Sequence, residues 1–207
     1  MRHFLLILAL VMLTSFTYGQ ESEQMISITG GLANPIGGDD LRYWKTGFNV
    51  GAGYSFALSN TLWWGVQVDF SRFGFNPESY LNDWNKWWPD SQTNTNITGN
   101  GRSFYSISGC FTVMLADKSK IKPFIQGGMG VTILTSSIIA VNGEGKSFYS
   151  TYGNLGILAG AGIAFELTPR TSFIIETKYQ KFVWPVNLEY SHSASIATIK
   201  TGMVFWM

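Results

Sequence analysis

The stretch Glu189–Ser195 holds the side chains that could do acyl-transfer chemistry. Glu189, His192 and Ser193 stand close together, and a serine activated by a histidine base is a common nucleophile. No oxyanion motif accompanies them, and the stretch falls in a short connection between two alternating runs. We therefore predict no catalytic residue here and do not expect the chain to be an enzyme, although a lipid-modifying hydrolase at His192 remains a minor alternative.

Five charged residues form a second group with possible chemistry, and all lie on the polar side of alternating runs. They are Asp69, Glu166, Glu176, Lys178 and Lys200. If these polar sides point into an enclosed space, each charge needs a partner of opposite sign or water. We expect a salt-bridged interior network, with Lys178 or Lys200 pairing with Asp69, and keep open the alternative of a narrow polar pathway.

The elements that would position these charges are eight runs with a strict period of two. The third run, "LWWGVQVDFSRF", sets apolar residues from Leu62 to Phe70 against Gln67 and Asp69. The runs are Gln24–Ala33, Thr46–Leu58, Leu62–Phe73, Gly101–Leu115, Ile121–Thr135, Thr151–Leu167, Thr171–Trp184 and Ser193–Met207. Short and long connections alternate between them, which is typical of an up-and-down barrel with long loops on the outside.

The composition favours a membrane barrel over a soluble one. Charged residues make up 13% of the chain and aromatic residues 15%, whereas a soluble surface alone carries about 25–35% charged residues. In lipid only helices and closed sheets satisfy the backbone, and the period excludes helices. The sequence predicts an all-β fold, an eight-stranded antiparallel up-and-down transmembrane β-barrel. The alternative is a soluble barrel whose apolar faces surround a hydrophobic ligand.

The N-terminus predicts export. Residues 1–19 combine Arg2 and His3 with an apolar run and a small residue, Gly19, which is typical of a cleaved signal peptide. Residues 20–207 then form a single domain of zero formal charge, which gives no electrostatic case for nucleic acid. With Cys110 and His192 as its lone cysteine and histidine, that domain is not expected to hold a metal, a cofactor or an internal disulfide.

Three stretches resemble small outer-membrane β-barrel proteins of the OmpA and OmpX type. They are "ISITGGLANPIG" (Ile26–Gly37), "KPFIQGGMGV" (Lys122–Val131) and "GILAGAGIAFELTPRTSFIIETKY" (Gly156–Tyr179). The resemblance implies a monomer in the outer membrane that contacts lipid and lipopolysaccharide. It also implies recognition of the C-terminal strand by the barrel-assembly machinery, although "TGMVFWM" ends on Met207 where an aromatic residue is usual. A structural or surface-interaction role is expected, with small-solute transport or ligand binding as the alternative.

The loop Asn76–Asn100 is the candidate contact surface outside the barrel. Asn76 can cap a helix that starts at Pro77, and Pro89 would end it. Leu81, Trp84 and Trp88 would share one face, and Trp87 stands beside them. Two interpretations stay open for these four residues: packing on the barrel rim, or stacking on an external glycan, lipid or partner protein.

Overall fold

A computed structural model gives the structure of the protein and describes residues 23–38, 41–89, 95–116, 119–149, 151–185 and 194–207. The predicted signal peptide and the stretch around His192 lie outside these residues, so neither prediction is tested. None of the helices among the described residues is long and apolar enough to cross a membrane.

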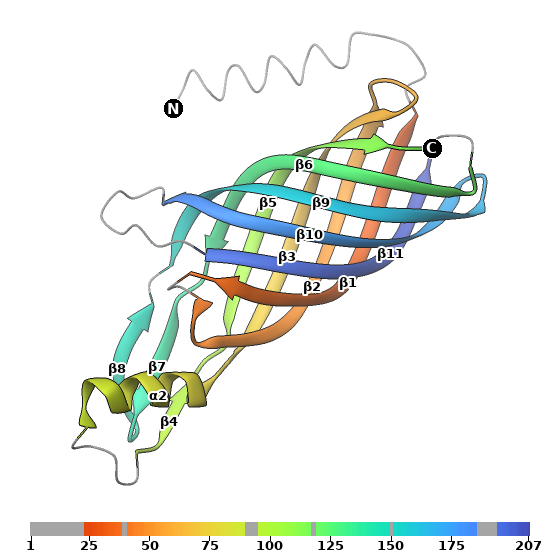
Figure 1. The fold of residues 1–207 in the computed structure, drawn as a ribbon. Helices are drawn as coiled ribbons and strands as arrows, with labels where there is room; N and C mark the ends of the chain where they lie inside the picture. Colours follow the sequence, from red (N-terminus) through yellow and green to blue (C-terminus); the bar gives the residue numbers. More distant parts are fainter. Residues whose placement is uncertain (1–22, 39–40, 90–94, 117–118, 150, 186–193) are drawn as a thin grey trace, which may run out of the picture.

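Eight antiparallel strands close into a barrel, as the alternation predicts (Figure 1). Each strand pairs with the next strand of the barrel, and β1 pairs with both β2 and β11, so no edge is left open. Around the barrel they are β1 (Gln24–Gly37), β11 (Ala194–Trp206), β10 (Thr171–Pro185), β9 (Tyr152–Thr168), β6 (Ile121–Leu134), β5 (Arg102–Met114), β3 (Leu62–Phe75) and β2 (Trp44–Ala57). Both described ends of the chain lie at one end of the barrel.

The polar side of each strand faces inward. On β3, Val68 is 50% exposed on the outer surface, whereas its neighbour Asp69 is 8% exposed inside. Asp69 lies opposite Gly51 of β2 and Ser106 of β5 in the strand register. The apolar side of "LWWGVQVDFSRF" therefore faces outward, which confirms the predicted assignment of the two faces.

Aromatic rings on the outer surface form two rows across β2, β3 and β5. Phe48, Phe70 and Tyr105 form the row farther from the chain termini, which we call the upper row, and their ring centroids are 5.7 and 5.0 Å apart. Phe56 and Trp64 form the lower row, with centroids 5.3 Å apart. Phe48 and Phe56 are eight residues apart on β2, roughly 27 Å along a tilted strand. At the strand tilt of about 35–45° found in membrane barrels, this length projects to a height of about 20 Å, near the apolar band of about 25 Å that such barrels present between two aromatic girdles.

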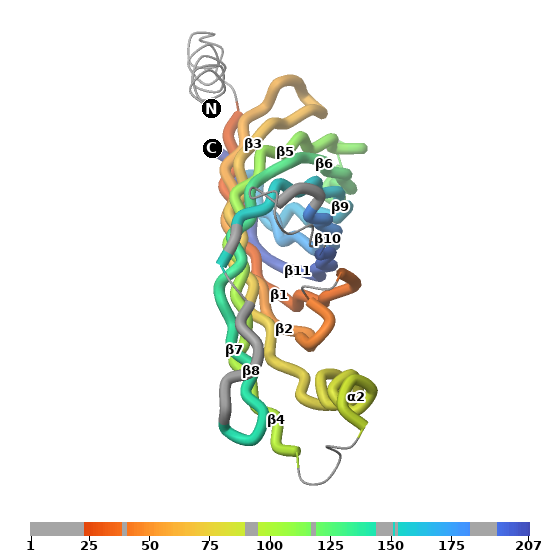
Figure 2. Tube along the Cα trace, turned by 90° about the vertical axis from the view of Figure 1, so that its left-hand side faces the viewer, coloured from red at the N-terminus to blue at the C-terminus, as the bar shows by residue number. Residues whose placement is uncertain are grey.

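The long connections build ordered structure beyond the barrel end that lies away from the termini (Figures 1 and 2). A helix, α2 (Pro77–Trp87), follows β3. A three-stranded sheet forms from β4 (Ile97–Gly99), β7 (Ser137–Val141) and β8 (Glu144–Tyr149). The long connection between β6 and β9 thus carries two strands, and β7 pairs with β4 from the preceding long loop. We call α2 together with this sheet the surface module.

Candidate functional site

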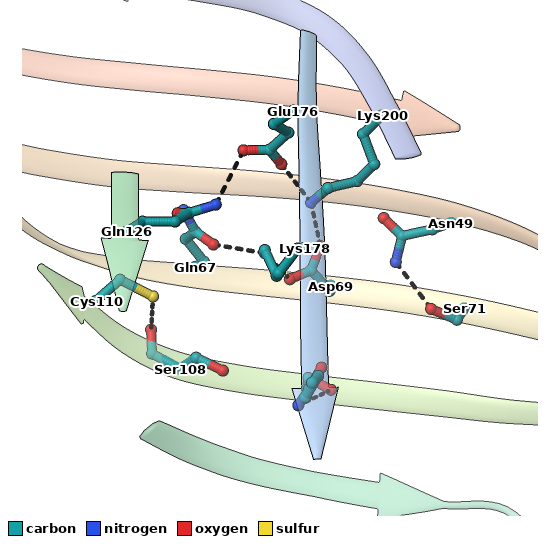
Figure 3. Close-up of polar contacts among 12 residues, drawn as sticks. Asn49, Gln67, Asp69, Ser71, Ser108, Cys110, Gln126, Glu176, Lys178 and Lys200 are labelled. Carbon is teal, nitrogen blue, oxygen red and sulfur yellow. Dashed lines mark hydrogen bonds and ion pairs between the residues drawn. The ribbon is translucent and has the colours of Figure 1, made fainter. Parts of the chain in front are cut away.

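Six polar side chains form a closed ring of hydrogen bonds and ion pairs across the lumen (Figure 3). The ring carries two carboxylates and two ammonium groups and is therefore neutral. Lys178 Nζ donates to Asp69 Oδ2 at 2.9 Å and to Gln67 Oε1 at 2.6 Å. Gln67 Nε2 donates to Gln126 Oε1 at 3.0 Å, and Gln126 Nε2 donates to Glu176 Oε2 at 3.2 Å. Lys200 Nζ closes the ring, since it contacts Glu176 Oε1 at 2.8 Å and Asp69 Oδ1 at 2.9 Å.

The strands place these groups on opposite walls of the barrel. Lys178 lies on β10 and Asp69 on β3, and these strands are four places apart in the closed order of eight. The Lys178–Asp69 contact therefore crosses the full width of the lumen. A buried charge without a partner is costly, so a neutral and fully paired ring is the arrangement that a closed interior requires.

Glu166 lies apart from this ring. It pairs with Lys122 at 3.3 Å, and Lys122 Nζ also lies 5.2 Å from the ring centroid of Trp206. This group stands at the barrel end that holds the described termini, so the expectation of one five-residue network was wrong for Glu166. Conversely, Gln67 and Gln126 are part of the ring and were not among the predicted site residues. Their inward positions on alternating strands were the available signal.

A glycine on the neighbouring strand β2 makes room for Asp69 of the ring. A Cβ atom built on Gly51 would lie 2.5 Å from Asp69 Oδ1 and 3.0 Å from Thr29 Oγ1. Asp69 cannot move aside freely, because both of its oxygens are held by lysines. The inward glycines of this barrel are thus a condition for enclosing charged side chains in a narrow lumen.

We expect Gly51→Ala to lower the free energy of unfolding by about 1–3 kcal/mol, because overpacking forces the paired carboxylate out of position. The measurement is a reversible urea titration of the folded barrel in lipid or detergent, followed by tryptophan fluorescence. Gly109→Ala is the matched control, since a Cβ atom there meets nothing within 4 Å. Equal losses in both variants would contradict the crowding at Gly51.

Apolar layers close the lumen on both sides of the ring. Toward the surface module, Phe104 packs against Phe73 and Phe182, with ring centroids 5.1 and 5.9 Å apart. Toward the termini, Trp63, Met114 and Phe124 form a second buried cluster. Cavities next to the ring have volumes of about 10 to 30 Å³. These volumes are far below those of ligand pockets.

A larger cavity of about 590 Å³ opens at the barrel end that holds the termini. Trp63 and Trp206 line it together with Lys122 and Arg170. Trp63 also belongs to the apolar cluster that separates this cavity from the ring. The cavity is therefore a vestibule and does not continue as an open passage through the described part of the lumen.

Metal chemistry has no support in the described residues. No group of three or more His, Cys, Asp or Glu side chains among them could hold a metal ion. Cys110 is buried on the inner face, where its thiol donates to the backbone oxygen of Ser108 at 3.9 Å.

Outside the barrel, α2 starts as the sequence predicts. The Asn76 side chain accepts a hydrogen bond from the backbone N–H of Ser79, and Pro77 occupies the first turn. The helix is fixed to the rim by Asp83, which is buried. Asp83 Oδ2 pairs with Arg42 at 2.7 Å and accepts from the Tyr43 hydroxyl at 3.1 Å. Sequence reasoning missed Asp83, since its partners lie in the preceding long loop.

The four predicted contact residues of α2 do not share one environment. Leu81 and Trp84 are partly buried against the apolar cluster at the rim, which also contains Tyr80. Trp87 and Trp88 are 55% and 58% exposed. Trp88 is the C-cap residue of α2, which ends at Trp87, and its ring centroid lies 6.1 Å from that of Trp84. An exposed tryptophan pair results, on a helix that is itself anchored.

Comparisons with known proteins agree with this geometry. A family model described as the outer membrane protein beta-barrel domain matches residues 4–201. Neisserial surface protein A is similar in fold, with a TM-score of 0.51, 13% identity, and coverage of 90% of this chain and 97% of that chain. A major outer membrane protein from Thermus thermophilus gives a TM-score of 0.56 at 10% identity, over 89% of this chain and 99% of that one. No curated protein matches the sequence.

Proposed function

Because this chain belongs to the outer membrane protein beta-barrel domain family, we propose that it serves as a closed anchor that presents a binding surface outside the cell. The observation that carries this proposal is the contrast between its two ends. The lumen is filled by the polar ring and by apolar layers on both sides of it. The surface module, in contrast, extends beyond the barrel and exposes the pair Trp87 and Trp88.

The exposed tryptophans are suited to binding. A large aromatic side chain held on a rigid helix loses little conformational entropy when it meets a ligand, and tryptophan is enriched among residues that dominate binding energies. Asp83 supplies this rigidity through Arg42 and Tyr43. Lys86 pairs with Asp83 as well, at 3.4 Å, and adds a cation to the same helix. Aromatic faces next to a cation favour sugars, acidic sugars among them, as ligands.

Transport and catalysis are the less favoured functions. The cavities beside the ring hold at most about one to three water molecules each, which argues against passage of solutes through this state of the barrel. A hydrolase at His192 would act in a segment outside the described residues. We also propose that lipopolysaccharide surrounds the barrel and that β11 is read by the assembly machinery during insertion.

The proposal is tested with the fluorescently labelled, folded barrel in micelles on a printed array of neutral and acidic glycans. We expect wild-type protein to bind a discrete subset. We expect the Trp87→Ala/Trp88→Ala variant to lose at least about tenfold in apparent affinity, since loss of one aromatic hot spot costs about 2 kcal/mol or more.

The matched control is Ile36→Ala/Ile138→Ala, which removes two exposed apolar side chains at the same end of the barrel outside α2. It should bind as wild type does. Gel mobility before and after boiling verifies that each variant is folded. Equal binding by all three proteins would show that the two tryptophans do not contribute to glycan binding. Single-channel conductance of the wild-type barrel in planar bilayers would favour transport instead.

A further inference from the structure

Lys45 and Arg72 are two cations on the lipid-facing side of the barrel. Lys45 pairs with Gly74 across β2 and β3, and Arg72 pairs with the outward-facing Phe48. Both side chains are exposed. The Lys45 stem lies across Gly74, because a Cβ atom built there would be 3.2 Å from Lys45 Cε. A Cβ atom on Gly101 would lie 3.6 Å from Arg72 Nε, so the guanidinium group extends toward the start of β5. Together they form a basic patch on adjoining strands.

The height of this patch is given by the aromatic rows. Arg72 stands two residues beyond Phe70, and Lys45 three residues beyond Phe48, in both cases on the side away from the termini. The patch is therefore just above the upper girdle, where the hydrocarbon of a bilayer gives way to headgroups. On β10, Lys181 repeats the pattern two residues beyond the outward-facing Tyr179.

The outer face of the described barrel strands carries no acidic residue that could pair with these cations. The acidic residues of the eight barrel strands are Asp69, Glu166 and Glu176, and all three lie on the inward face with basic partners. No ion pair within the described residues involves Lys45 or Arg72. A cation that faces lipid without an internal partner needs an anion from the membrane.

We infer that Lys45 and Arg72 form a binding site for the phosphate groups of the anionic glycolipid in the outer leaflet. Arg72 supplies a planar donor set that matches a phosphate, and Lys45 adds a mobile point charge beside it. The aromatic row of Phe48, Phe70 and Tyr105 directly below would contact the start of the acyl chains. The site lies on the barrel wall, so it is independent of the proposed binding function of Trp87 and Trp88.

The test uses native mass spectrometry of the folded barrel in an uncharged detergent, titrated with diphosphoryl lipid A. Two further lipids serve as probes: lipid A stripped of its phosphates, and phosphatidylglycerol. We expect wild-type protein to bind diphosphoryl lipid A at least about tenfold more tightly than either of them. We expect the Lys45→Gln/Arg72→Gln variant to lose most of this preference while its binding of the stripped lipid stays unchanged.

Lys120→Gln/Arg170→Gln is the matched control, because it removes two exposed positive charges at the opposite end of the barrel. It should keep the preference of the wild type. Heat-dependent gel mobility verifies that both variants are folded. Equal retention of diphosphoryl lipid A by the two double variants would overturn the site, and equally tight binding of phosphatidylglycerol by wild type would overturn its assignment to a glycolipid.

Discussion

Replacing Asp69 with asparagine should destabilise the barrel by about 3–5 kcal/mol, because it leaves a buried ammonium group without its carboxylate. Lys178 would keep only neutral amide oxygens as acceptors, that of Gln67 and that of the new side chain, whereas Lys200 would retain the carboxylate of Glu176. The side-chain volume hardly changes, so a loss of this size would come from charge and not from packing. The measurement is reversible urea unfolding of the membrane-inserted barrel.

The charge-balanced double variant tests whether the ring stabilises the barrel because its positive and negative charges cancel. In Asp69→Asn/Lys178→Met, the remaining charges are Glu176 and Lys200, which pair at 2.8 Å. Replacing both members of a buried pair is often nearly neutral, so we expect this variant to recover more than half of the lost stability. Asn49→Leu is the uncharged control, since Asn49 is buried nearby and donates to Ser71 at 2.8 Å. Equal instability of the single and double variants would refute the electrostatic explanation.

The alternation of the sequence was sufficient to predict the barrel but not everything built on it. Each run combines an apolar side and a polar side, and in a chain without enough surface charge only lipid can cover the apolar sides. The outward position of Val68 and the inward position of Asp69 follow directly from this pattern, because one step along a strand reverses the face. The pairing of Lys178 with Asp69 needs more, namely the closed order that sets β10 opposite β3.

The surface module shows where local patterns fail. The start of α2 is encoded locally in Asn76 and Pro77, and the sequence predicted it. The sheet of β4, β7 and β8 joins two loops whose pairing residues are about 40 positions apart, such as Thr98 and Ala140. Asp83 likewise binds Arg42 and Tyr43 from another loop. Contacts between distant loops depend on the barrel that brings the loops together, so no short motif reveals them.

The apolar layer above the ring should be the other large contributor to stability. Phe104 is 1% exposed and contacts Phe73 and Phe182 inside a closed wall. Its replacement by alanine should lower the free energy of unfolding by about 3–5 kcal/mol. This loss is the sum of the lost transfer free energy and the cost of a cavity that the closed wall cannot collapse to fill. Urea unfolding in lipid gives this value. Phe111→Ala is the matched control on the outer face, where Phe111 is 50% exposed. There lipid chains fill the space, so we expect a loss of only about 1–2 kcal/mol.

A double variant of the same apolar layer distinguishes a sealed anchor from a gated pore. In Phe104→Ala/Phe182→Ala the upper layer is opened, but the polar ring and the cluster of Trp63, Met114 and Phe124 still close the lumen. We therefore expect no conductance steps in planar bilayers from this folded variant or from wild type. If opening the upper layer alone produced steps, Phe104 and Phe182 would be a gate and the lumen a path. A silent and destabilised variant would mean that the aromatic layer, like the ring below it, stabilises the barrel as an anchor for the surface module.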